Sequence, residues 1–159
     1  MKRLIAGTLA MLCMAGCASS PSAATKASSI SIDHRVIPAS TEIGPAVAAY
    51  AGFENRGAAD RLLGIDCDCA TSIELHHVVR DGDKVSMTNT FPLTIPAMAR
   101  VEVKPPGVPL HFMLVGTKRA FVVGERVPMR MRFERAGVVE ADFIVVEKSQ
   151  EGWDAWQSE

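Results

Sequence analysis

The feature that most restricts the fold is a series of short apolar segments, each alternating with polar residues and ending near Gly, Pro or Asn. Apolar residues at every second position are typical of a strand that buries one face. The segments recur at roughly regular spacing, which predicts an all-β sandwich or barrel. Residues 58–63 and the tail could form helical turns. The predicted strands are residues 30–38, 47–53, 61–65, 72–79, 84–88, 100–104, 110–115, 127–133 and 138–146.

Two of these strands form a predicted hairpin. Residues 72–79 and 84–88 flank the sequence Asp-Gly-Asp at 81–83, which is typical of a tight turn. Because the two strands run side by side in such a hairpin, His76 and Met87 could be cross-strand neighbours.

A second pair of the same residue types follows in a later strand. His111 and Met113 are two residues apart, so the period of a strand places both on one face and Phe112 on the other. Together with His76 and Met87 they supply two imidazoles and two thioethers. Thioether sulfur is soft and selects Cu(I), and imidazole suits copper in either oxidation state. The alternative is that the methionines fill the core and the histidines are ordinary surface or hydrogen-bonded residues.

The spacing of these four residues resembles the motif of the PCuAC family of periplasmic copper chaperones. Ten residues separate His76 from Met87, and a longer gap leads to the His-x-Met of His111 and Met113. The gap of 23 residues after Met87 is slightly longer than the family pattern. The resemblance extends over residues 30–147, and three further segments carry it: FENRGAADRLLG at 53–64, LTIPAMARVEVKPPGVPLHFMLVG at 93–116 and VVGERVPMRMRFERAGVVEADFIV at 122–145.

The resemblance implies a cupredoxin-like Greek-key β-sandwich, a fold that the strand pattern alone does not distinguish from other sandwiches. It also implies that His76, Met87, His111 and Met113 bind copper as Cu(I), with Cu(II) as a second state. The implied function is copper delivery toward cytochrome oxidase copper centres, alone or with a thiol-containing assembly factor. The alternatives are a periplasmic copper-buffering protein and a metal-free scaffold.

Cys67 and Cys69 add something that the family pattern lacks. Three interpretations remain open: a disulfide, auxiliary copper or redox ligands, and an incidental pair. In an extended strand, cysteines at positions i and i+2 are poorly placed for a relaxed disulfide, because their Cα atoms lie near the upper distance limit. His77 faces away from His76 in a regular strand, so it is left outside the ligand set.

The N-terminus predicts export. Residues 1–17 have a basic start, an apolar run and small residues before Cys17, the pattern of a lipoprotein-type signal. Met-Ala-Gly-Cys at 14–17 resembles a lipobox, which makes Cys17 the expected lipidation site. The alternative is ordinary secretion with cleavage after a residue such as Ala24. Residues 18–29 then form a flexible tether, and we expect a periplasmic, membrane-anchored protein.

The remaining chain is long enough for one domain, residues 30–148, followed by a polar tail, 149–159, with two tryptophans expected to be exposed. Without Lys2 and Arg3 there are 15 basic and 18 acidic residues and no basic patch, so nucleic acid is not an expected partner. The sequence has no Gly-x-Ser-x-Gly, phosphate-loop or His-Glu-x-x-His motif, which argues against an enzyme.

Overall fold

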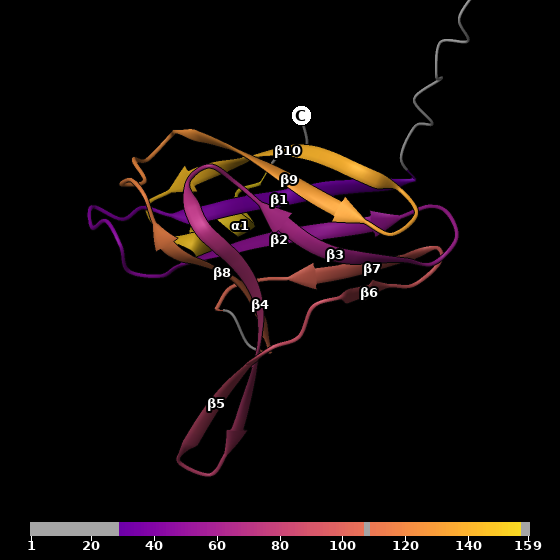
Figure 1. The fold of residues 1–159 in the computed structure, drawn as a ribbon, viewed down its shortest axis with the longest axis horizontal. Coiled ribbons are helices and arrows are strands. Elements are labelled where there is room, and N and C mark those ends of the chain that lie inside the picture. The colour runs from indigo at the N-terminus through magenta and orange to yellow at the C-terminus, as the bar shows by residue number, and fades with distance from the viewer. Residues whose placement is uncertain (1–28, 107–108, 157–159) are drawn as a thin grey trace, which may run out of the picture.

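The computed structural model describes residues 29–106 and 109–156, and the regular elements of this part are strands apart from one short helix (Figure 1). The predicted all-β fold is confirmed. Its elements in chain order are β1 (Ile30–Pro38), β2 (Val47–Asn55), β3 (Asp60–Asp66), β4 (Ala70–Asp81), β5 (Lys84–Asn89), β6 (Leu93–Ile95), β7 (Ala99–Val103), β8 (Leu110–Thr117), β9 (Arg126–Phe133), β10 (Gly137–Val146) and α1 (Ser149–Asp154).

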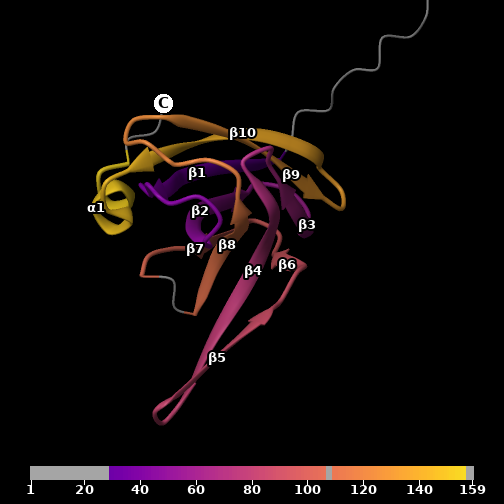
Figure 2. The same cartoon turned by 60° about the vertical axis from the view of Figure 1, so that its left-hand side comes forward.

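The strands are hydrogen-bonded in the order β5-β4-β8-β2-β1-β10-β9-β3-β6, and β7 pairs with β2. β2 joins the two halves of this path, because its first residues pair with β8 and its later residues pair with β7 and β1. The path curls so that β4 and β8 lie across the core from β9 and β10 (Figure 2). Phe53 of β2 sits between the two halves, with its ring centroid 6.2 Å from that of Phe112 in β8 and 6.3 Å from that of Phe133 in β9.

The hairpin of β4 and β5 extends beyond this core as an arm (Figures 1 and 2). β4 is 12 residues long, but β8 pairs with it only as far as His77. Every residue of β5 is exposed, and its ladder runs from His76 opposite Asn89 to Asp81 opposite Lys84. The predicted hairpin and its turn are confirmed, with Gly82 at φ +57° in the connection.

Two expectations were wrong. Residues 58–63 form no helical turn: Asp60 begins β3, where alternating buried residues pair with β6 and β9. The tail does form a helical turn, α1, but Trp153 is buried rather than exposed, because α1 folds back and packs Trp153 beside Val36 and Tyr50. The tail is thus part of the domain surface.

Candidate metal centre

The face of β4 and β8 that points away from the core carries both predicted histidine ligands. Leu75 and Phe112 point into the core and are almost fully buried, so their neighbours in sequence point the other way. His76 lies directly opposite His111 across the β4–β8 ladder. Their ring centroids are 5.3 Å apart at an interplanar angle of 75°. Register and strand parity therefore bring the two imidazoles together.

The His76 ring is held by a carboxylate. Nε2 of His76 lies 2.7 Å from Oε2 of Glu74, two residues earlier on the same face of β4. A carboxylate accepts hydrogen bonds and donates none, so Nε2 carries the proton and donates it to Glu74. Among the described residues, the buried Nδ1 atom of His76 has no hydrogen-bond partner. This arrangement leaves the Nδ1 lone pair for a metal, and the carboxylate fixes the ring as it does around many metal-bound histidines.

Glu74 was not among the residues predicted from the sequence. Its distance of two positions from His76 places both side chains on one face of a strand, and this was the available signal. Whether a carboxylate at that distance bonds the ring depends on its rotamer, which the sequence does not give.

Met113 and Met87 lie on the same face as the two histidines. Met113 pairs with Glu74 across the β4–β8 ladder and is half-buried. Met87 pairs with Val78, two residues beyond His76 at the root of the arm, and 54% of it is exposed. The predicted cross-strand relation of His76 and Met87 is therefore diagonal, since Asn89 is the residue directly opposite His76.

Exposure increases steadily across the set. His111 is buried, with 6% exposure, and the side chain of His76 is 16% exposed. Met87, on the arm, is the most exposed. An ion bound between these residues would have two imidazole nitrogens on the domain side and a thioether on the solvent side. Such a site would combine two imidazole ligands held in place by the domain with a thioether ligand that an incoming protein can displace from the solvent side.

Cys67 and Cys69 lie elsewhere. Their sulfurs are joined in a disulfide in the turn between β3 and β4, with Cα atoms 5.2 Å apart. A turn rather than an extended strand brings the Cα atoms to the usual disulfide distance. Six residues lie between Cys69 and His76, and the seven residue steps of extended chain span roughly 23 Å. The structure therefore does not bring these sulfurs to the His76–His111 pair.

His77 points to the opposite face from His76, as expected, and pairs with Leu110 and Thr88. Among the described residues, no group of three or more His, Cys, Asp and Glu side chains could hold a metal ion. The set at this face instead consists of two imidazoles and two thioethers.

Comparison with known proteins places the chain in a family. Residues 30–145 match the model of a family described as "Putative lipoprotein LpqE-like". The chain belongs to the LpqE-like family. A comparison with curated protein sequences found no match.

Solved structures similar to this LpqE-like chain include PCuAC domains. The copper-bound PCuAC domain from PmoF2 is 26% identical, with a TM-score of 0.62 over 76% of this chain and 94% of that one. The apo PCuAC domain from PmoF1 is 20% identical, with a TM-score of 0.64 over 76% and 95%. The Cu(I) form of DR1885 from Deinococcus radiodurans is 24% identical, with a TM-score of 0.58 over 84% of each chain. The predicted resemblance to PCuAC proteins and the cupredoxin-like fold are thereby confirmed.

The predicted signal at 1–17, the lipidation site Cys17 and nearly all of the tether at 18–29 lie outside the described residues. Within the part of the LpqE-like chain that the structure does describe, no helix has the length and apolarity needed to cross a membrane.

Proposed function

We propose that this protein is an extracytoplasmic copper chaperone that binds Cu(I) through His76, Met87, His111 and Met113 and passes it to a partner protein. The observation that carries the proposal is the pairing of His76 with His111, whose ring centroids are 5.3 Å apart. Glu74 holds the His76 ring through Nε2 and leaves Nδ1 of His76 available. Similarity to the copper-bound PmoF2 domain and to Cu(I)-DR1885 supports the choice of metal.

The mixed ligand set suits transfer rather than storage. Thioethers bind Cu(I) but bind it less strongly than thiolates, so a thiolate pair on an acceptor can displace them one at a time. The exposed Met87 would be the first ligand replaced, and the buried His111 the last. The acceptor we propose is a cytochrome oxidase copper centre or a thiol-containing factor that assembles it. Binding Cu(I) and passing it to an acceptor do not require the protein to be an enzyme.

A deletion strain tests delivery against copper buffering. If the protein delivers copper, loss of the gene lowers cytochrome oxidase activity in cells grown at low copper, and a copy carrying His76→Ala and His111→Ala does not restore it. Buffering instead predicts normal oxidase activity at low copper together with sensitivity to high copper. That result would contradict delivery while leaving copper binding intact.

Met113 should contribute to the site in a way that a core methionine does not. We expect Met113→Leu to weaken Cu(I) binding about tenfold, because Leu retains the packing and removes the thioether. The matched control is Met131→Leu, a buried methionine on β9. Titration of the disulfide-bonded protein against a chromogenic Cu(I) chelator measures both. Equal effects of the two variants would mean that Met113 acts through packing alone.

Glu74 should act as a positioning residue for His76. We expect Glu74→Gln to weaken Cu(I) binding about 10-fold to 100-fold, the usual effect of losing a carboxylate behind a metal-bound histidine. The loss should disappear when His76→Ala is already present, since Glu74 acts only through the His76 ring. Glu102→Gln, on a strand away from this face, is the control. A loss of the same size in the His76→Ala background would mean that Glu74 does not act through His76.

Anchoring through Cys17 is also part of the proposal, supported by the lipoprotein description of the family. Mass spectrometry of the mature protein should find an acylated Cys17 as its first residue, and Cys17→Ser should release the protein from membranes. An unmodified terminus near Ala24 would contradict the anchor.

A further inference from the structure

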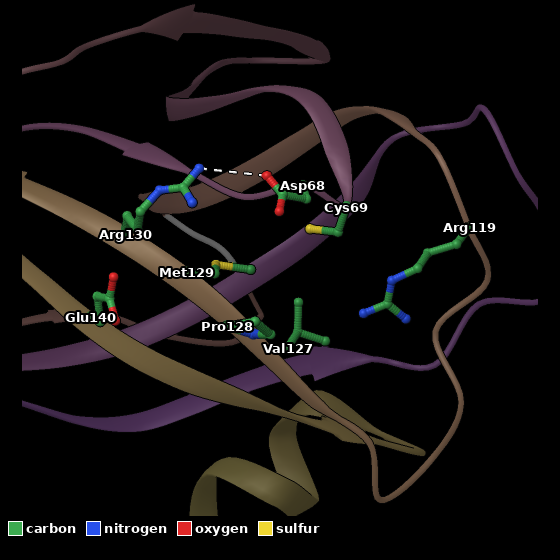
Figure 3. Close-up of a pocket in the computed structure, with 8 residues that line it drawn as sticks. All are labelled: Asp68, Cys69, Arg119, Val127, Pro128, Met129, Arg130 and Glu140. Atoms are coloured by element: carbon green, nitrogen blue, oxygen red, sulfur yellow. Dashed lines mark ion pairs between the residues drawn. The ribbon is translucent and has the colours of Figure 1, made fainter.

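The turn between β3 and β4 forms one wall of a pocket (Figure 3). This turn lies at the opposite end of β4 from the hairpin with β5. The pocket has a volume of about 360 Å³. Cys69 lines it and is only 4% exposed, although its neighbour Asp68 has a side chain that is 97% exposed. The backbone fixes this turn, because the N–H of Lys118 donates to the carbonyl of Cys69 at 2.8 Å.

A third sulfur, that of Met129, belongs to the same pocket. Figure 3 shows the side chains of Cys69 and Met129 pointing toward one another. The β3–β9 ladder ends with Asp66 opposite Arg130. Cys67 directly follows the end of β3 and is half-buried against the core, and Met129 is the neighbour of Arg130 on β9 and is almost fully buried. The disulfide joins Cys67 to Cys69, which shares the pocket with the thioether of a buried methionine.

We propose that the reduced form of this turn is a second Cu(I) site, with Cys67, Cys69 and Met129 as its ligands. A dithiol reductant would transfer two electrons and two protons to the disulfide and become a disulfide itself. Cu(I) then replaces the two thiol protons and binds two thiolates and one thioether, the soft ligands that select this ion. Oxidation of the pair to the disulfide removes the site.

The charges around the pocket fit this assignment. Cu(I) bound to two thiolates carries a net charge of −1. Arg119 and Arg130 line the pocket, and the acidic groups that line it are Asp68 and Glu140. Nη2 of Arg130 lies 3.5 Å from the carboxylate of Asp68 in an exposed ion pair, and an exposed pair of this kind is weak and can rearrange. Arg119 is already paired with the carboxylate of Glu125, so Arg130 is the guanidinium that can turn to compensate the charge of the bound ion.

The second site is independent of the first. Roughly 23 Å of extended β4 separates Cys69 from His76, so one ion cannot bind both sets. The proposal therefore stands whether or not the histidine site carries copper, and its test uses the chain without that site.

The experiment is a Cu(I) titration of the purified chain carrying His76→Ala and His111→Ala, against a chromogenic chelator. After reduction by a phosphine that is then removed, this chain should bind one Cu(I). The oxidised chain should bind none, and neither should a reduced chain that also carries Cys67→Ser and Cys69→Ser. X-ray absorption at the copper edge should show sulfur neighbours without imidazole.

Met129→Leu tests the thioether in the same background. It should weaken Cu(I) binding by the reduced chain about tenfold, whereas Met131→Leu, also buried on β9, should leave it within about twofold. Thermal unfolding confirms that each variant is folded. The proposal is overturned if the reduced histidine-free chain binds no Cu(I), if it binds copper through nitrogen, or if Met129→Leu and Met131→Leu have equal effects.

Discussion

Replacing both His76 and His111 by Ala is expected to weaken Cu(I) binding by the disulfide-bonded protein by at least about 100-fold, or about 2.8 kcal/mol. The two rings lie directly opposite one another, and they form the inner, more buried part of the proposed ligand set. Without them, two thioethers remain, one of them on the exposed arm. Competition with a Cu(I) chelator measures the change.

His77→Ala is the matched control for this prediction. It removes an imidazole from the same strand, one residue away, but from the opposite face of the sheet. We expect its effect on Cu(I) affinity to be less than about threefold. If His77→Ala lowers Cu(I) affinity as much as the double variant does, affinity does not depend on which face of β4 the imidazole occupies, and the ligand assignment is wrong.

Strand parity explains how much of this site could be predicted from the sequence. A period of two fixes the face of each side chain once a strand is recognised. Parity alone was enough to predict that His76 and His77 lie on opposite faces. It was also enough to predict that His111 and Met113 share a face. Register is different, because it depends on long-range pairing. The sequence did not give His111 as the residue opposite His76, nor Val78 as the one opposite Met87.

The features that the sequence did not predict share a cause: each depends on contacts between distant segments. Trp153 is buried because α1 returns to β1 and β2. Asp60 opens a strand because β6 and β9 supply its partners, although the local pattern allowed a helical turn. The disulfide depended on whether residues 67–69 are extended or turned, and the turn allows the 5.2 Å separation.

Phe53→Ala should have the largest effect on stability. We expect it to lower the free energy of unfolding by about 3–5 kcal/mol, the usual cost of removing a fully buried aromatic side chain, out of a total of about 5–15 kcal/mol. Phe53 is fully buried and contacts Phe112 and Phe133 edge-on, so its loss leaves a cavity between the two halves of the sheet. Chemical denaturation should show a lower midpoint with an unchanged slope.

Phe91→Ala is the control for the aromatic contact itself. Phe91 stacks on Phe112 from the edge of the core, at 6.3 Å between centroids, but is only half-buried. We expect it to cost about 1–2 kcal/mol. If Phe53→Ala costs no more than this, Phe53 does not hold the two halves together.

Copper should offset part of the loss in Phe53→Ala. A ligand that binds only the folded state stabilises it by about 2.7 kcal/mol at 100 times its Kd. Cu(I) at that excess should therefore raise the free energy of unfolding of oxidised Phe53→Ala and of the unmodified protein by similar amounts, and both unfolding midpoints should rise. The recovery should disappear when His76→Ala and His111→Ala are added. Recovery that persists without the histidines would mean that copper stabilises the oxidised domain through other residues.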